Sequence, residues 1–68
     1  SMNITEKKIL TKREVANLLR LSTTSIDTMV KAGEFIPGFK RGLRRVGWFE
    51  DEVKSWLEKK VEERYQQE

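Results

Sequence analysis

Two short segments with helical spacing of apolar residues follow one another almost directly and leave this chain few possible folds. The first begins at Thr11, which with Glu14 has the spacing of a capping box: each side chain can bond the backbone N–H of the other residue. Apolar residues at helical intervals follow, so the pattern predicts a helix over about residues 12–20.

The second segment starts after a connection of two or three residues. Ser22 or Thr23 can cap a helix over about residues 23–32, because a hydroxyl satisfies a free N–H at a helix start. Gly33 stands where a left-handed residue commonly ends a helix. Two short helices joined this tightly predict a helix-turn-helix.

Residues 39–48 have the pattern of a β-hairpin. A two-residue turn at Gly42 and Leu43 places glycine at the first central position, as a type II′ turn requires. This turn predicts a register that pairs Arg41 with Arg44. The same register pairs Phe39 with Val46, puts Phe39, Val46 and Trp48 on the inward face, and points Lys40 and Arg45 outward.

A third helix is expected from Glu50 or Asp51 to about Tyr65. Its predicted apolar stripe consists of Val53, Trp56, Leu57, Val61 and Tyr65. Ile9 and Leu10 fit either a short strand or a hydrophobic staple. The expected fold is mainly α with a small β-hairpin, a winged helix-turn-helix of order α-α-β-β-α, as one domain over residues 9–65 with residues 1–8 and 66–68 loose.

The residue types that are missing narrow the possible functions. The 68 residues include no histidine and no cysteine, which removes the commonest general base, the commonest metal ligand and any thiol chemistry. We therefore expect no enzyme, no cofactor, no metal site and no small-molecule substrate. No apolar run approaches the roughly 20 residues that span a bilayer, so we expect a cytoplasmic protein without a membrane partner.

Charge is unevenly distributed along the chain. Residues 1–49 carry ten Lys and Arg against four acids, whereas residues 50–68 carry four against seven, for a net charge of +3. A basic body with an acidic tail segment indicates a polyanionic partner on one side, although chance can also produce such asymmetry.

The second helix presents short polar side chains that suit a DNA major groove. Hydroxyls can bond phosphates or base edges, and a threonine methyl can meet a thymine methyl. The predicted DNA-binding residues here are Thr23, Thr24, Ser25, Asp27, Thr28 and Lys31. The alternative is that the hydroxyls only cap the helix. Asp27 can read a cytosine amino group, pair with Lys31 or face away from DNA.

The hairpin carries the stronger signal for nucleic-acid binding. Its predicted DNA-binding residues are Lys40, Arg41, Arg44 and Arg45, four cations within six residues. Charges that serve solubility are usually of mixed sign, which favours contact with a minor groove or phosphates over a merely solvated hairpin. A second basic group, formed by Lys7, Lys8, Lys12 and Arg13, fits phosphate contacts or random placement equally well. Trp48 and Trp56 are expected in the core rather than stacked on bases.

Residues 9–57 resemble the AlpA-like and excisionase-like DNA-binding domains of phages and mobile elements, which are small relatives of the MerR-type winged helix. The matching residues are Leu10, Thr11, Glu14, Val15, Ala16, Leu19, Ser22, Ser25, Ile26, Met29, Val30, Gly33, Phe35, Pro37, Trp48, Val53, Trp56 and Leu57. Ile36 is an insertion relative to the family pattern and shifts the expected start of the wing. Gly47 replaces a frequent basic residue, which predicts one wing contact fewer.

The resemblance implies a second helix in the major groove and a wing on the adjacent minor groove or backbone. It implies a prophage transcriptional regulator, an excisionase that steers an integrase, or both, in a protein of bacterial or phage origin. Expected partners are double-stranded DNA, a phage-type integrase and further copies of the chain on DNA. The alternative is a protein-interaction module that recruits an integrase or another partner through the C-terminal helix.

Overall fold

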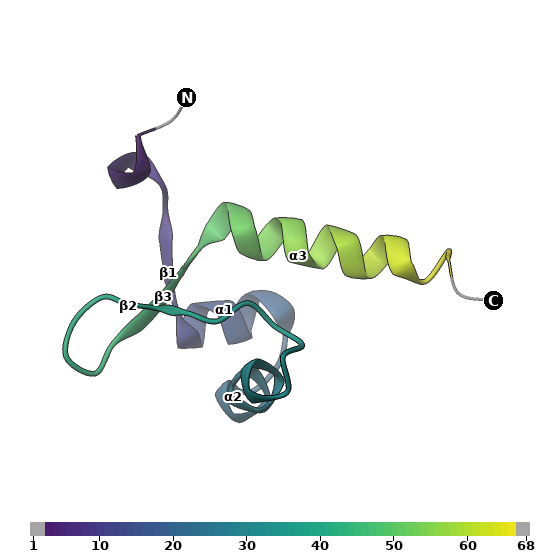
Figure 1. The fold of residues 1–68 in the computed structure, drawn as a ribbon, viewed down its shortest axis with the longest axis horizontal. Coiled ribbons are helices and arrows are strands. Elements are labelled where there is room, and N and C mark those ends of the chain that lie inside the picture. Colours follow the sequence, from purple (N-terminus) through teal and green to yellow (C-terminus); the bar gives the residue numbers. More distant parts are fainter. Residues whose placement is uncertain (1–2, 67–68) are drawn as a thin grey trace.

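The computed structural model describes residues 3–66 as three α-helices, one short 3-10 helix and a small antiparallel sheet. In chain order the elements are η1 (Ile4–Glu6), β1 (Ile9–Thr11), α1 (Lys12–Leu19), α2 (Thr23–Lys31), β2 (Phe39–Lys40), β3 (Val46–Phe49) and α3 (Glu50–Glu63). Figure 1 shows α1 and α2 below the sheet, with α3 running away from both. This arrangement confirms the mainly α fold with a β-hairpin, of winged helix-turn-helix type, and places one strand ahead of the first helix.

The ends of the chain were predicted to be loose. Within residues 1–8, the structure places η1 over Ile4–Glu6, with the Asn3 side chain accepting from the Thr5 N–H at 3.1 Å. Residues 1–2 and 67–68 lie outside the described residues. Over residues 3–66, no helix combines the length and the apolar character needed to cross a membrane.

The helix pair α1–α2 begins at the caps that the sequence indicates. The Thr11 hydroxyl accepts from the Glu14 N–H at 3.1 Å, and the Glu14 carboxylate accepts from the Thr11 N–H at 2.9 Å. Ser22 caps α2 by accepting from the Ser25 N–H at 3.1 Å. Gly33 follows α2 with a φ of +75°, which glycine adopts at no steric cost. Both helices therefore agree with the prediction to within one residue.

The sheet has the strand order β1-β3-β2, and both pairs are antiparallel. Ile9 and Leu10, for which the sequence allowed a strand or a staple, belong to strand β1. Leu10 lies opposite Trp48, and Ile9 lies opposite Phe49. Because β3 is paired on both sides, the hairpin is bonded to the chain segment that leads into α1.

The predicted hairpin register is wrong by one residue. Phe39 pairs with Gly47 and not with Val46. Since successive residues of a strand point to opposite faces, this shift puts Phe39 on the face away from Val46 and Trp48. There its ring packs on Phe49, with centroids 4.9 Å apart. Only Val46 and Trp48 of the three predicted inward residues pack with the core.

The turn of the hairpin explains the shift. The Arg41 N–H donates to the Arg45 carbonyl at 2.9 Å, so three residues separate the last bonded pair instead of two. Arg41 therefore faces Arg45 and not Arg44. Lys40, predicted to point away from Val46, pairs with it on the same face and remains exposed.

The core lies between the α1–α2 pair and one face of the sheet. Its buried residues are Leu10, Val15, Ala16, Ile26, Phe35, Trp48 and Val53. The Trp48 indole N–H donates to the Ile36 carbonyl at 2.7 Å, and that of Trp56 donates to the Glu34 carbonyl at 3.2 Å. The Trp56 ring also packs edge-to-face on the Phe35 ring, with centroids 4.7 Å apart. Both tryptophans are thus structural, as predicted, and hold the segment between α2 and β2.

Helix α3 buries only the first part of its predicted apolar stripe. Val53 is fully buried and Trp56 is half-buried, but Leu57, Val61 and Tyr65 are 39%, 43% and 75% exposed. The C-terminal half of α3 projects from the body (Figure 1). The radius of gyration is accordingly 13.0 Å, against about 11 Å for a compact chain of this length.

Gly38 provides a test of the packing around Trp48. A Cβ atom at Gly38 would lie 2.9 Å from Cζ2 of the indole, so Gly38→Ala must displace the ring or the backbone. We expect a loss of about 1–3 kcal/mol in the free energy of unfolding. Gly42→Ala is the matched control, because a Cβ there meets nothing within 4 Å. Urea titrations followed by tryptophan fluorescence measure both, and equal midpoints for the two variants would contradict the packing described.

Candidate nucleic-acid interface

The wing, which comprises β2, β3 and the loop between them, meets the first turns of α1 and α2 around an open surface depression of about 560 Å³. We name this depression the basic hollow. Its lining residues are Thr11, Lys12, Arg13, Thr23, Arg41, Arg44, Arg45 and Val46. Five of these eight are cations and none is an acid. A concave surface lined by one sign of charge concentrates the field and attracts a polyanion.

The basic hollow brings two of the predicted groups to one side of the molecule. Arg41, Arg44 and Arg45 come from the wing, and Thr23 comes from the first turn of α2. Had the wing and α2 lain on opposite sides, no single depression could have contained residues of both. Lys40 is exposed but does not line the hollow.

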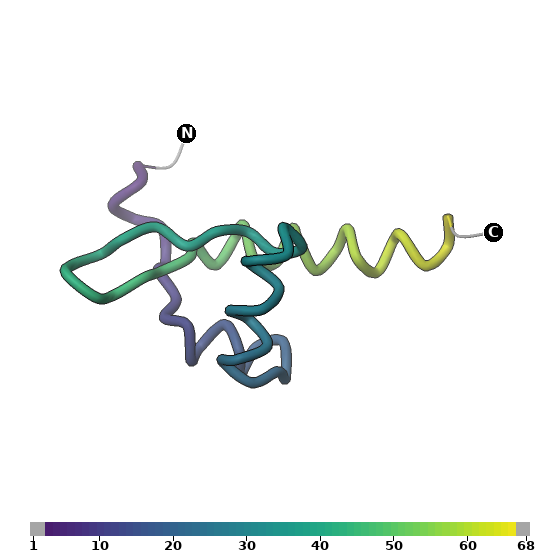
Figure 2. Tube along the Cα trace, turned by 60° about the horizontal axis from the view of Figure 1, so that its bottom comes forward, coloured from purple at the N-terminus to yellow at the C-terminus, as the bar shows by residue number. Residues whose placement is uncertain are grey.

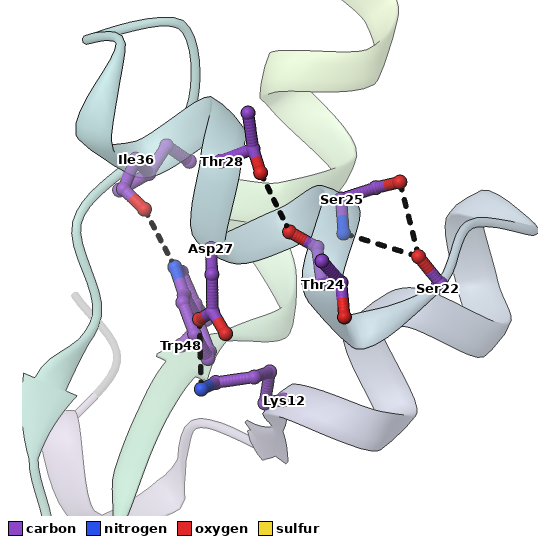
Figure 3. A network of polar contacts seen from close by, with 8 residues as sticks. All are labelled: Lys12, Ser22, Thr24, Ser25, Asp27, Thr28, Ile36 and Trp48. Atoms are coloured by element: carbon purple, nitrogen blue, oxygen red, sulfur yellow. Dashed lines mark hydrogen bonds and ion pairs between the residues drawn. The ribbon is translucent and has the colours of Figure 1, made fainter.

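The rest of α2 carries its polar residues on the outside of the molecule. The exposed members of the predicted set are Thr23, Thr24, Asp27, Thr28 and Lys31. The Thr28 hydroxyl donates to the Thr24 carbonyl at 3.0 Å (Figure 3). Its oxygen still has lone pairs that can accept a hydrogen bond from a ligand. The outer threonines are therefore not covered by α3.

Ser25 differs from the other predicted residues of α2. It is half-buried, not exposed, and its hydroxyl accepts from the Ser22 hydroxyl at 3.0 Å (Figure 3). Its backbone N–H donates to the same Ser22 oxygen. The capping interpretation thus accounts for Ser22 and Ser25, but not for the threonines between and beyond them.

Asp27 pairs with a residue that the sequence did not suggest. Its carboxylate lies 2.8 Å from the ammonium group of Lys12, at the start of α1 (Figure 3). Pairing with Lys31 was one of three alternatives that the sequence left open for Asp27, and the ion pair that forms is with Lys12 instead. Asp27 and Lys31 line a second depression, which we name the second hollow, and Lys12 lines both hollows.

The second basic group of the sequence is divided by the fold. Lys7 pairs with Asp51 at 3.3 Å and Lys8 with Glu50 at 3.7 Å, both at the start of α3. Lys12 pairs with Asp27, as described above. Arg13 forms no ion pair with any residue in the described part of the chain, and it lines the basic hollow.

The four wing cations are exposed, and none forms an ion pair within residues 3–66. The stem of Arg41 lies against the backbone of Gly47, where an added Cβ would come 2.6 Å from the Arg41 Cδ atom. Gly47 therefore leaves room for the arginine stem across the sheet. The absence of a basic residue at position 47 is thus linked to the placement of Arg41.

The N-cap and first turn of α1 also line the basic hollow, through Thr11, Lys12 and Arg13. Lys12 and Arg13 belong to the second basic group, for which the sequence left phosphate contact and random placement open. Their place in the hollow fits the first of these two interpretations. Cations in the first turn of a helix oppose the positive end of its dipole, and an anionic ligand offsets that cost. Within residues 3–66, no group of three or more potential metal ligands occurs.

Glu14 anchors this first turn. Its pKa is lowered, mainly because its carboxylate accepts from the Thr11 backbone N–H. Desolvation opposes this as the second-largest effect on the pKa, and the Thr11 hydroxyl and the positive charges of Lys8 and Arg41 lower the pKa further. The hydrogen bonds of the cap therefore favour the ionised carboxylate.

Comparison with known proteins gives two matches. Residues 8–61 match the sequence family described as prophage CP4-57 regulatory protein (AlpA). The chain is also similar to an uncharacterized protein, ORF88, of Enterobacteria phage P4, with 34% identity over 55 residues. That alignment covers 81% of this chain but 62% of ORF88, so the chain spans less than two thirds of this relative. No solved structure gives a significant match.

Proposed function

This chain belongs to the AlpA family of prophage regulatory proteins, and we propose that it binds double-stranded DNA in a sequence-specific manner without catalysing a reaction. In this proposal α2 enters the major groove. The wing contacts the adjacent minor groove or the backbone. DNA binding then serves prophage transcription, excision with a phage-type integrase, or both.

The observation that carries the proposal is the basic hollow. Three wing arginines and Arg13 are left without acidic partners among the described residues, beside the first turn of the helix proposed to read bases. Lys and Arg that neutralise phosphates supply most of the sequence-independent affinity for DNA. The position of Thr23 in the same hollow supports simultaneous contact by α2 and the wing.

The outer face of α2 is proposed to supply the sequence preference. Thr24 and Thr28 are exposed and present methyl groups and hydroxyl oxygens. A methyl group can meet the C5-methyl of thymine, and a hydroxyl can bond several base edges. Lys31, one turn beyond Asp27, can reach a phosphate or a guanine.

A specific observation also favours a second role for α3. Leu57 and Val61 form an exposed apolar stripe on the projecting half of α3, and the exposed Tyr65 lies in the turn just beyond the last helical residue, Glu63. Apolar stripes of this kind mark interaction sites when they are not covered. The alternative function is therefore a protein-interaction module that recruits an integrase or another partner, or a second copy on DNA.

Removal of the wing arginines tests the proposed function. Arg44→Ala combined with Arg45→Ala should weaken binding to every duplex by about tenfold or more. It should also reduce the slope of log K against log salt by roughly 1.8, about 0.9 for each phosphate that is no longer neutralised. Lys54→Ala with Lys59→Ala removes the same charge from α3 and is the matched control. Fluorescence anisotropy over a salt series measures both slopes. A wild-type affinity independent of salt, or equal effects of the two double variants, would contradict the proposal.

Thr28→Val tests the role of the outer threonines. The change preserves the side-chain shape but removes the hydroxyl, so we expect an altered base preference at one or two positions, worth about 1–3 kcal/mol each, with the salt slope unchanged. Selection of bound duplexes from a random pool, followed by sequencing, measures the preference. Thr5→Val, in the distant η1, is the control. An identical selected site for wild type and Thr28→Val would remove Thr28 from the proposed contacts.

The stripe on α3 can be tested separately from DNA binding. Leu57→Ser with Val61→Ser should leave duplex affinity within about twofold, because both positions lie far from the wing and surface changes are usually mild. Regulation or excision in cells should be abolished. Glu58→Gln with Glu62→Gln, on the polar side of the same helix, is the control. Full cellular activity of the serine variant would rule out the partner role.

A further inference from the structure

One ion pair lies in the middle of the proposed DNA-binding side. Lys12, from the start of α1, reaches across to Asp27 on α2, with 2.8 Å between Nζ and Oδ1 (Figure 3). Lys12 lines both the basic hollow and the second hollow, so the pair stands at their boundary. A ligand that follows the surface from the wing to α2 must pass over it.

The exposure of the pair argues against a purely structural role. The side chains of Lys12 and Asp27 are 35% and 55% exposed. Ion pairs open to water contribute little to stability, because solvent screens the attraction and two long side chains must be ordered. The α1–α2 pair is already held by the capped helices and by the buried Val15, Ala16 and Ile26.

The charge of Asp27 is unusual for its position. Among the residues that line the two hollows it is the one acid, against five cations in the basic hollow and Lys31 beside it. A carboxylate at this place repels phosphates and keeps Lys12 from contacting one. Both effects lower the affinity for any duplex, whatever its sequence.

We infer that Asp27, through its ion pair with Lys12, is a specificity-determining residue that lowers the affinity for non-target DNA. The inference rests on the proposed function. On a non-target duplex, the Asp27 carboxylate gains no hydrogen bond from a base and repels nearby phosphates, and its ion pair keeps Lys12 from contacting a phosphate. On a target, the carboxylate accepts a hydrogen bond from an exocyclic amino group such as N4 of cytosine. Discrimination of this kind comes from a penalty on wrong partners as well as from contacts with the right one.

Asp27→Asn tests the inference. With the charge removed and Lys12 free to contact a phosphate, affinity for a scrambled duplex should rise about five- to tenfold, and the salt slope should steepen by about 0.9. Affinity for a duplex selected from a random pool by the wild-type protein should rise less or fall. The ratio of the two affinities should therefore drop about tenfold. Anisotropy titrations with both duplexes, for each variant, measure these quantities.

Asp51→Asn is the matched control. Asp51 is 59% exposed and pairs with Lys7 at 3.3 Å, so the control removes the same charge and releases a lysine as well, but away from both hollows. We expect it to change affinity for either duplex by less than about twofold. Lys12→Gln combined with Asp27→Asn should return the scrambled-duplex affinity close to wild type, because no lysine is released.

The outcomes separate this inference from the proposed function. If wild type binds DNA with a salt-dependent affinity but Asp27→Asn behaves like Asp51→Asn, the role of Asp27 is wrong and the proposed function stands. A loss confined to the selected duplex would also overturn the inference, since Asp27 would then only read a base. If wild type shows no salt-dependent binding, both fall. Circular dichroism and urea midpoints establish that the variants remain folded.

Discussion

The indole of Trp48 joins the sheet to the segment that leaves α2, and the position of the wing depends on this contact. The ring is 3% exposed, donates to the Ile36 carbonyl at 2.7 Å and lies so close to Gly38 that a side chain there would collide with it. On the sheet, Trp48 lies opposite Leu10. Because β3 carries both Trp48 and one side of the wing, this packing sets how far the wing stands from α2, and hence whether one depression can contain residues of both.

The second determinant is how the fold distributes its ion pairs. Glu50 and Asp51 begin α3, where acids are favoured by the helix dipole, and they pair with Lys8 and Lys7. The acids that begin α3 therefore neutralise cations away from the hollows. Asp27 is the one acid that lines either hollow, and it pairs with Lys12. A small net charge of +3 is thus compatible with a strongly positive local surface.

Helix α3 has an anchored first half and a projecting second half with exposed apolar side chains. Its first half is anchored by Val53 and by Trp56, which bonds the Glu34 carbonyl, and its second half projects with Leu57 and Val61 uncovered. The loop of the wing and the C-terminal end of α3 lie at opposite ends of the molecule (Figure 2). With this separation, the proposed duplex at the wing and the proposed partner at α3 would not compete for the same side chains.

The helices and their caps could be predicted from the amino-acid order, because capping boxes and apolar spacing act within one or two turns of chain: Thr11 with Glu14, and Ser22 with Ser25. The family was indicated by the resemblance of residues 9–57 to AlpA-like domains, not by these local patterns. The run of exposed wing cations could also be predicted locally, because no acid lies among residues 40–45. The hairpin register could not be predicted, because apolar neighbours for Phe39 exist on both faces of the sheet. The ring of Phe49, the close approach of Gly38 to Trp48 and the three-residue turn select one of these faces. Nor could the sequence show that Lys12 pairs with Asp27 or that Arg13 joins the wing arginines, because these proximities arise only when α1, α2 and the sheet pack together.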